Sequence, residues 1–446
     1  MHISQKRKSE MKNKTIHVGL IGFGVVGSGT AKILLENSDI LTERSGLKIN
    51  LKKIADKDIV TDRGIKVPKR LLTTDVNTLF KDPDIEIIVE LIGGIHPAKD
   101  FIVQAIQHGK HVVTANKALL ATEGADIFRA SRKAGVEVGF EAAVAGAIPI
   151  IKVMKEGLIA NRIHAIYGII NGTSNYILTK MTNEEVEFID ALKEAQELGY
   201  AEADPTFDIE GIDTAHKLTI LATLAYGIPL SFDSVHVEGI SNISAQDISF
   251  ASELGYKVKL LAITKESEGG IELRVHPTML PGEYLIAKVD GPFNAIYVDG
   301  DATGSTLYYG RGAGSVPTGS AVVSDIVDIA RNIHKASVGR VPTIPPLSGK
   351  KRIKKIDNIT SMYYFRFSAL DRPGVLSTIS GILGKYNISI ASVIQKGRRI
   401  GEAVPLVVLS HEAQEKNVRK AINEIDRLSV VRGKTVFIRV EDKEAR

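Results

Sequence analysis

The segment from Gly22 to Gly27 constrains the fold of this chain more than any other feature. It directly follows an apolar run at residues 16–21 and opens a helical pattern that continues to residue 35. In that setting the first glycine permits a tight turn, the second admits a pyrophosphate, and the third allows a helix to pack closely on a strand. The helix N-terminus adds free N–H groups for the diphosphate. The sequence therefore predicts a dinucleotide site formed by Gly22, Phe23, Gly24, Val25, Val26 and Gly27; the alternative is a glycine-rich turn that binds no nucleotide.

The end of the second expected strand bears on the choice of cofactor. Asp56 occupies the place where a carboxylate would hold the adenosine ribose hydroxyls of NAD. It follows Gly22 at a longer spacing than usual because residues 36–49 contain an insertion. Lys57, with Lys52 and Lys53 nearby, would instead accept the 2′-phosphate of NADP. The sequence leaves the preference for NAD or NADP open.

Strands and helices alternate through the first part of the chain. Apolar strands are expected at residues 49–55, 85–91 and 111–114, with a helix at residues 98–108. This alternation implies a parallel, doubly wound sheet. The sequence therefore predicts a Rossmann-like dinucleotide-binding domain at residues 15–140, preceded by a disordered extension at residues 1–14.

The rhythm of strands and helices changes after residue 140. Further strands are expected at residues 162–170, 258–264, 271–276 and 295–298, and helices at residues 187–198, 212–226 and 317–334. These elements predict a second, α+β domain at residues 141–334, whose last helix returns to brace the first domain. A proline-containing basic linker at residues 335–358 then leads to a ferredoxin-like βαββαβ pattern at residues 359–446. The predicted class is α/β.

Composition excludes several kinds of site and partner. The chain has no cysteine, so disulfides, thiolate zinc sites and cysteine nucleophiles are excluded. Its net charge of +5 is diffuse except for basic runs at residues 6–8 and 349–355, which lack interleaved aromatic side chains. We interpret these runs as a solvated tail and linker, not as a nucleic-acid patch. Neither a bilayer-spanning segment nor a signal peptide is evident, so we expect a cytoplasmic protein.

An acidic stretch at residues 199–217 is the strongest candidate for a substrate site. It gathers five carboxylates within twelve residues, and Lys217 follows them. Asp213 and Lys217 are four residues apart, so they share one face of a helix that starts near Gly211. Asp213 lies in the first turn, where the helix dipole favours negative charge. Taken alone, this spacing favours a surface ion pair worth under about 1 kcal/mol.

Six segments taken together resemble the homoserine dehydrogenase family, and they occur in the family's order. They are residues 22–27, 114–117 ("TANK"), 140–150 ("FEAAVAGAIPI"), 168–178 ("GIINGTSNYIL"), 199–217 and 310–326 ("GRGAGSVPTGSAVVSDI"). The resemblance covers about residues 16–334, and the combination is highly specific. Residues 369–393 resemble an ACT domain, a small-molecule sensor of amino-acid enzymes. The chain thus looks like the monofunctional form that carries this sensor.

The resemblance implies a reaction and reverses the preference for a surface ion pair. The family interconverts L-homoserine and L-aspartate 4-semialdehyde with NAD or NADP, in threonine, methionine and isoleucine biosynthesis. The alternatives are another two-domain amino-acid dehydrogenase and a non-catalytic, nucleotide-linked amino-acid sensor. The combination of Glu202, Asp213 and Lys217 argues against the first alternative. The presence of Lys117 and Lys217 argues against the second.

The resemblance also implies the roles of individual residues. Lys217 is the expected proton donor, and Asp213 and Lys117 complete the catalytic set. Glu202, Asp213 and Lys117 are the expected substrate-binding residues. Burial would lower the pKa of Lys217 and Asp213 would raise it, and the sequence leaves that balance open. The alternative for Lys117 is an exposed lysine after a helix cap at Asn116. The resemblance also assigns catalysis and dimerisation to residues 141–334.

Further cofactor and substrate contacts are implied at turns. Ile92, Gly93, Lys117, Gly199 and Gly314 are expected to contact the dinucleotide, although Ile92 and Gly93 also fit a plain strand-to-helix turn. The polar run at residues 171–175 is expected to meet the substrate carboxylate. It also fits a helix N-cap at Thr173 or Ser174.

Two more ligands are implied by the resemblance. A monovalent cation, sodium, would be bound by Glu141, Val144, Gly146 and Ile148, because one carboxylate and three carbonyl oxygens suit a hard ion. The alternative is an empty turn. Threonine is the expected effector of the tail, at Asp371, Gly374 and Val375, and the alternative is a purely structural dimerisation module. A homodimer or a larger homo-oligomer is expected.

Overall fold

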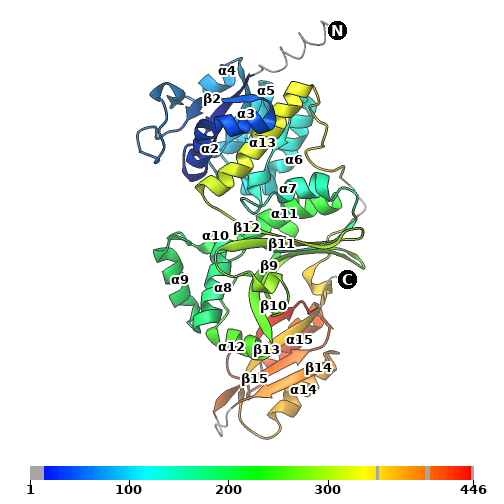
Figure 1. Cartoon of the computed structure of the whole chain (residues 1–446). Helices are drawn as coiled ribbons and strands as arrows, with labels where there is room; N and C mark the ends of the chain where they lie inside the picture. The colour runs from blue at the N-terminus through cyan, green and yellow to red at the C-terminus, as the bar shows by residue number, and fades with distance from the viewer. Residues whose placement is uncertain (1–14, 348–350, 397–401, 443–446) are drawn as a thin grey trace.

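The computed structural model describes residues 15–347, 351–396 and 402–442. The expected extension at residues 1–14, with the first basic run, lies outside the described residues, as do residues 349 and 350 of the second run. Figure 1 shows three parts stacked along the length of the molecule: the nucleotide-binding domain, a second sheet with its helices, and the tail.

A six-stranded parallel sheet forms the core of the first domain, in the order β3-β2-β1-β4-β5-β6. Its strands are β1 (Thr15–Ile21), β2 (Lys48–Ala55), β3 (Leu72–Thr73), β4 (Ile85–Glu90), β5 (His111–Thr114) and β6 (Val138–Gly139). Its helices are α2 (Val25–Glu36), α3 (Ser38–Ser45), α4 (Asn77–Lys81), α5 (Ala98–Gln107), α6 (Lys117–Ala134) and α13 (Ser315–Lys335). The predicted doubly wound sheet is confirmed. Its strand order reverses between β1 and β4, where such sheets bind ligands.

Helix α13 packs directly on α2, although the two are almost 300 residues apart in sequence. Glycines make the close approach possible: a Cβ on Gly29 would overlap the backbone of Ser315, and a Cβ on Gly319 would crowd the backbone of Gly29. Ala321, Val322 and other apolar residues of α13 join the core of the first domain. The returning helix begins two residues before the expected position, at Ser315.

An eleven-stranded sheet runs through the rest of the chain, in the order β12-β11-β7-β9-β10-β17-β13-β15-β14, with β8 and β16 beside this path. Its first part contains β7 (Ile163–Ile169), β8 (His236–Val237), β9 (Tyr256–Ser267), β10 (Gly270–Pro281), β11 (Phe293–Gly300) and β12 (Gly304–Arg311). The accompanying helices are α7 (Ile150–Lys152), which runs into a π-helical turn at Val153–Gly157, α8 (Gly172–Glu184), α9 (Phe188–Glu197), α10 (Thr206–Ile209), α11 (Ile212–Tyr226) and α12 (Ala245–Glu253). The expected strands at residues 258–264 and 271–276 are thus parts of one long hairpin, β9–β10.

Strand β12 was not predicted from the sequence. Most of its side chains are exposed or half-buried, so it carries no apolar pattern. Its pairing with β11, from Phe293–Arg311 to Gly300–Gly304, places it at the edge of the sheet. An edge strand of this kind is defined by its partner more than by its own side chains.

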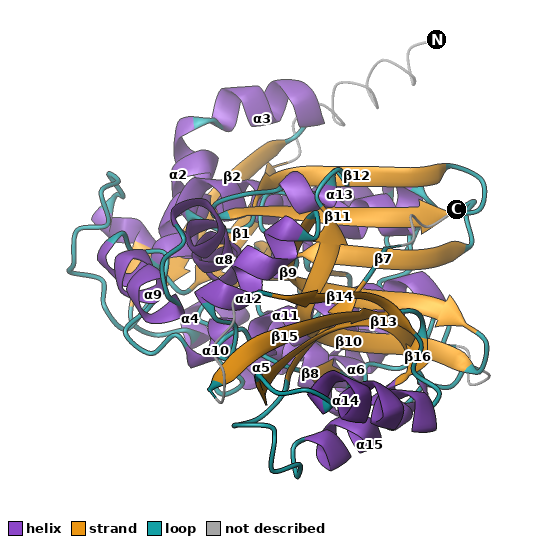
Figure 2. Cartoon of the chain, turned by 90° about the horizontal axis from the view of Figure 1, so that it is seen from below, coloured by secondary structure: helices purple, strands orange, loops and turns teal. Residues whose placement is uncertain are grey.

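The tail forms the expected ferredoxin-like unit. Its elements are β13 (Thr360–Leu370), α14 (Val375–Lys385), β14 (Ile390–Gln395), β15 (Ala403–Ser410), β16 (Ala413–Gln414), α15 (Glu415–Ile425) and β17 (Val436–Val440). Figure 2 shows α14 and α15 side by side against the strands of the tail. In the parts of the chain that the structure describes, every helix is too short or too polar to cross a bilayer.

The sheet of the tail is continuous with that of the second domain, which the sequence did not reveal. The last strand of the chain, β17, pairs in parallel with β10 through Thr278–Arg439 and Met279–Val440. Buried ion pairs reinforce the junction: Arg439 binds both Glu238 and Glu415. Ahead of the tail, Ile271 N donates to the carbonyl of Arg352 at 2.8 Å. The tail is therefore an integral part of the scaffold that carries α11.

Candidate active site

Helix α11 packs against α6 of the first domain, and most of its residues are buried. Gly211 precedes it with a positive φ of 79°. A Cβ on Gly211 would press against Val275 of β10 and Val237 of β8. The glycine therefore permits both the turn and the close packing that fix where the helix starts.

Asp213 binds two lysines that come from different domains. Its Oδ2 lies 2.6 Å from Nζ of Lys217, one turn along α11, and its Oδ1 lies 3.1 Å from Nζ of Lys117 at the start of α6. Lys217 Nζ also donates to the carbonyl of Ile170 at 2.6 Å. Asp213 and Lys217 are buried, whereas the side chain of Lys117 is 40% exposed. The expected pair thus lies on one helix face, at the point where α11 meets the start of α6.

The two lysines have pKa values that shift in opposite directions. Burial lowers the pKa of Lys217, and this effect outweighs the opposing charge of Asp213. The charge of Asp213 raises the pKa of Lys117, with smaller contributions from Asp208 and Glu202. Burial alone would raise the pKa of Asp213, but Lys217 and Lys117 hold it far below its ordinary value. Asp213 is therefore an anion, Lys117 a stable cation, and Lys217 the more readily deprotonated of the two amines.

Asn171 links two of the carboxylates. Its Nδ2 donates to Asp208 Oδ1 at 2.6 Å and to Asp213 Oδ2 at 3.0 Å. Its Oδ1 accepts from Ser174 N at 2.8 Å, so Asn171 itself caps α8. The expected N-cap at Thr173 or Ser174 is wrong by two or three residues, because Thr173 donates to the carbonyl of Tyr200 and Ser174 to that of Asp208. Asp208 is thereby fixed beside Asp213.

Two other predicted residues belong to the acidic stretch: Glu202, expected to bind the substrate, and Gly199, expected to contact the cofactor. Glu202 is exposed, and its carboxylate raises the pKa of Lys117. Gly199 follows α9 with a positive φ of 75°. Asn116 caps α6 by accepting from Leu119 N, as the alternative interpretation of Lys117 expected. Lys117, the first residue of α6, also reaches Asp213, so the cap and a contact with the acidic stretch occur together.

A cavity of about 430 Å³ lies at the carboxyl ends of β1, β2 and β4. Predicted cofactor residues line it: Gly22, Gly24, Asp56, Lys57, Ile92 and Gly93. A Cβ on Gly24 would meet open space, whereas one on Gly27 would overlap the carbonyl of Gly22. The three glycines thus have the separate roles expected of a dinucleotide site, and the residues present fit that group.

Local bonds define the ribose end of this cavity. The carboxylate of Asp56 accepts from the backbone N–H groups of Phe23 and Asp58. Lys57 is exposed at the cavity. Lys52 instead binds Asp82 and Asp84, and Lys53 donates to the carbonyl of Arg70, so the three lysines do not form one cluster.

Glu90 organises the opposite edge of the cavity and was missed in the sequence. Its Oε1 accepts from the N–H groups of Ile92 and Gly93, and its Oε2 accepts from the hydroxyl of Thr114 at 2.7 Å. Burial raises its pKa. The signal was present as a carboxylate inside the apolar run of β4. Glu90 holds together the turns that carry Gly93 and Lys117.

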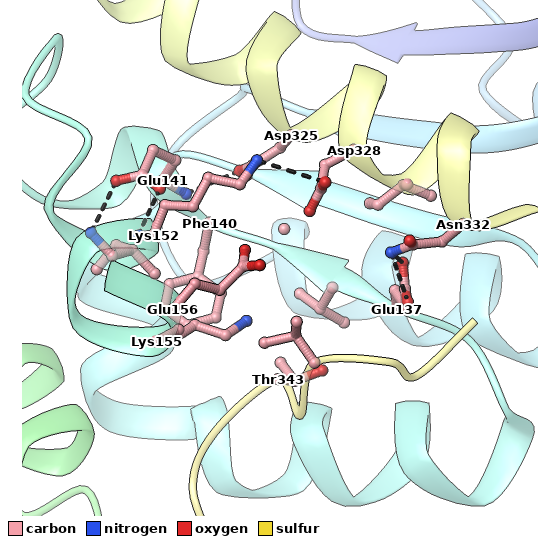
Figure 3. A pocket seen from close by; sticks show the side chains of 15 residues that line it. Glu137, Phe140, Glu141, Lys152, Lys155, Glu156, Asp325, Asp328, Asn332 and Thr343 are labelled. Atoms are coloured by element: carbon pink, nitrogen blue, oxygen red, sulfur yellow. Dashed lines mark hydrogen bonds and ion pairs between the residues drawn. The ribbon is translucent and has the colours of Figure 1, made fainter. Parts of the chain in front are cut away.

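The predicted cation residues lie where the chain passes between domains. Glu141 accepts from the N–H groups of Ile151 and Lys152 at the start of α7, and Figure 3 shows it close to Asp325 beside a cavity of about 50 Å³. Burial raises the pKa of Glu141 to about 7 and that of Asp325 to about 6. The carbonyl of Ile148 accepts from Ile150 N. Lys152 and Lys155 line the same cavity as Glu141 and Asp325, and among the described residues no cluster of three or more acidic or histidine ligands occurs.

Gly314 and the predicted effector residues of the tail lie outside the acidic stretch. Gly314, with φ 124°, immediately precedes α13. The predicted effector residues are in the tail, where Gly374 has φ 87° and precedes α14, which begins at Val375. Asp371 N donates to the carbonyl of Glu402. The effector loop therefore belongs to a separate part of the molecule from Lys117, Asp213 and Lys217.

Comparison with known proteins identifies the family of this chain. Models described as homoserine dehydrogenase, as homoserine dehydrogenase, NAD binding domain, and as ACT domain match residues 149–327, 22–141 and 363–429. The homoserine dehydrogenase of Neisseria gonorrhoeae is 47% identical over 431 residues, which are 96% of this chain and 99% of that protein. The chain belongs to the homoserine dehydrogenase family. The expected resemblance, the NAD(P)-dependent oxidoreductase activity and the ACT domain are thereby confirmed.

Other homoserine dehydrogenases extend the comparison. That of Bacillus subtilis is 39% identical, with coverage of 96% of this chain and 99% of that protein. The crystal structure of the enzyme from Thiobacillus denitrificans matches with 50% identity and a TM-score of 0.91, and it covers 96% of this chain and 99% of its own. A hyperthermophilic archaeal homoserine dehydrogenase in complex with NADPH matches with 26% identity and a TM-score of 0.59, over 71% of this chain and 98% of its own.

Proposed function

We propose that Lys217 transfers the proton in the interconversion of L-homoserine and L-aspartate 4-semialdehyde, and that Lys117 acts as a fixed positive charge. The position of Asp213 between the two lysines carries this assignment. Lys217 has the lowered pKa and Lys117 the raised one, so Lys217 is better suited to give up and regain a proton near neutral pH.

The chemistry balances with one proton-transfer group. When bound, the reduced dinucleotide supplies a hydride to the aldehyde carbon of the semialdehyde. As the carbonyl becomes an alkoxide, the ammonium of Lys217 gives its proton to that oxygen and becomes a neutral amine. In the reverse direction the neutral amine accepts the hydroxyl proton of homoserine. The bond from Lys217 to the carbonyl of Ile170 holds the amine in place through both steps.

The substrate ammonium is assigned to the carboxylates of this site. Asp213 and Glu202 are proposed to bind the ammonium and hydroxyl groups, and Asp208 stands next to Asp213 through Asn171. Burial raises the pKa of Asp208, and an arriving ammonium would favour its ionised form. The polar run at residues 171–175 remains the candidate for contact with the substrate carboxylate.

The dinucleotide is proposed to lie across Gly22–Gly27, with Ile92, Gly93, Gly199 and Gly314 toward its nicotinamide end. Asp56 suits the ribose hydroxyls of NAD, and Lys57 suits the 2′-phosphate of NADP. Replacing Lys57 with alanine should therefore reduce kcat/KM for NADPH more than for NADH. An equal loss with both cofactors would contradict a phosphate contact at Lys57.

Three further features are proposed from the family and the fold. Sodium is proposed at Glu141, Val144, Gly146 and Ile148, where it would stiffen the turn between domains. Threonine is proposed as a feedback effector at Asp371, Gly374 and Val375. A homodimer formed through the second sheet is also proposed, because the outer strand β12 leaves Tyr309 exposed. Titration of threonine against initial rate, and replacement of sodium by choline, test the two ligands.

The proton-transfer assignment is tested by following absorbance of the reduced cofactor with aspartate 4-semialdehyde as substrate. Lys217→Ala should lower kcat by roughly 10²- to 10⁴-fold, which is typical of a lost general acid. Lys99→Ala, which removes a surface lysine bound to Glu123, is the matched control and should retain full activity. No turnover by the wild-type protein would contradict the function. Turnover that survives Lys217→Ala would contradict only the assignment of the proton donor.

A further inference from the structure

Asn294 is a fully buried polar residue on the face of β11 that looks toward the catalytic helix. Ile296, two residues further on, packs in the same cluster as Leu218 of α11, whereas Ala295 belongs to the cluster on the opposite face of the sheet. Side chains alternate between the faces of a strand, so the amide of Asn294 points to the side of the active site.

The neighbours of Asn294 connect it to Lys217. Asn294 pairs with Gly310 of β12 on one side. On the other side the Ala295–Ile169 pair places it opposite the end of β7, where the carbonyl of Ile170 accepts from Lys217 Nζ at 2.6 Å. Asn294 therefore lies next to the group that holds the proposed proton donor.

Asn294 also lies under the crossing of two connections between the domains. A Cβ on Gly312 would overlap the side-chain amide of Asn294, and a Cβ on Gly146 would overlap the carbonyl of Gly312. Residues 144–150 lead from the first domain to the second, and residues 311–315 lead back to α13. Figure 1 shows the second of these connections between β12 and α13. Movement of one domain against the other must change the surroundings of this amide.

The hydrogen bonding of the Asn294 side-chain amide is unusual. Both Nδ2 and Oδ1 are buried without a hydrogen-bond partner in the portion of the chain that the structure describes. A buried amide that leaves both its donor and its acceptor unused is costly and rare in folded proteins. Its partner must offer both an acceptor and a donor, which a peptide backbone does. The nearest such backbone is the turn at residues 312–314, where Gly312 has no side chain to hinder approach.

We propose that Asn294 is a positioning residue for the reaction: its amide pairs with the backbone of the turn at residues 312–314 when the dinucleotide binds and the two domains close. The pairing fixes the turn that carries Gly314 relative to the strand end that holds Lys217. It adds to dinucleotide affinity because the hydrogen bonds form only in the bound state. The inference rests on the dinucleotide site proposed above.

The test compares ligand-free stability with the response to NADPH. Asn294→Leu removes the amide and keeps most of its volume. Without ligand, the variant should unfold at the wild-type temperature or above it, because an unpaired polar group has become apolar. Its NADPH-induced rise in unfolding temperature should be smaller than that of the wild type. The dissociation constant for NADPH should rise about ten-fold, the scale of one lost hydrogen bond. Asn294→Ser, a smaller change, provides the same comparison if the leucine variant does not fold.

Thr264→Val is the matched control. Thr264 lies on β9 of the same sheet, is equally buried, and its hydroxyl also lacks a partner among the described residues, but it is not next to the turn at 312–314. Its replacement should leave the NADPH response unchanged. If both Asn294 variants keep the full wild-type response to NADPH, the role of Asn294 is overturned. A wild-type protein that responds to neither NADPH nor NADH would overturn the dinucleotide site as well.

Discussion

Lys117 and Lys217 come from different domains, yet their ammonium groups contact opposite oxygens of one carboxylate, that of Asp213. The catalytic pair is therefore assembled only when the two domains are together. The shared carboxylate also accounts for the division of roles, since it keeps the half-exposed lysine charged while burial favours loss of a proton from the other.

Asp213→Asn tests this division. The change removes the nearest anion, so the pKa of Lys217 should fall further and that of Lys117 should lose its rise. We expect kcat/KM for homoserine to fall roughly 10- to 100-fold, the scale of a lost charged hydrogen bond. The acid limb of the pH–rate profile for homoserine oxidation should move to lower pH. An acid limb that stays in place would show that another group titrates there.

Asn171→Ala should harm both stability and substrate binding. It removes the cap of α8, which costs about 1 kcal/mol. It also leaves Asp208 and Asp213 facing each other without the bridging amide, so KM for homoserine should change more than KM for the dinucleotide. Chemical denaturation and initial rates measure the two effects. Asn77→Ala, at an exposed position on α4, is a control that should change neither KM.

His111 predicts a pH dependence of stability. Burial lowers its pKa to about 4 from the ordinary 6.5, while its Nδ1 accepts from Glu137 N. The folded state binds a proton less readily than the unfolded state, so this contribution is complete above pH 6.5 and is lost as pH falls toward 4, by up to about 3 kcal/mol. His111→Asn keeps an acceptor and does not titrate. The free-energy difference between the two proteins should therefore grow with pH across this window, and a constant difference would contradict the assignment.

Arg439 tests the junction with the ACT domain. Its guanidinium is buried against the half-buried Glu238 and the fully buried Glu415, so Arg439→Met should cost about 3 kcal/mol, because Glu415 then keeps only the partly exposed Arg419 as a cationic partner. Arg419 binds the same two carboxylates from a side chain that is 38% exposed. Arg419→Met should therefore cost under about 1 kcal/mol. Equal losses for the two variants in urea unfolding would show that burial does not set the strength of this junction.

The sequence predicts those parts of the molecule whose geometry depends on residues that are close together in the chain. The glycines at residues 22–27 and the four-residue spacing of Asp213 and Lys217 encode their geometry within one turn, and both are found as expected. Glu90 and the bridging role of Asn171 were missed because Thr114 and Asp213, the groups that they bind, are far away in sequence. Asn294 was missed because only the packed structure shows that its amide is buried. The balance of pKa values likewise depended on burial, which only the packed structure defines.

The pairing of β10 with β17 has a consequence for how the chain is made. Residues 436–440 come much later in the sequence than β10 and pair with Thr278 and Met279, while β8 covers Arg274 and Val275 on the same side. Until residues 436–440 leave the ribosome, the Thr278–Met279 end of β10 presents a bare edge that is prone to join another chain. The sheet that carries α11 is thus completed by a strand that is made long after its neighbour.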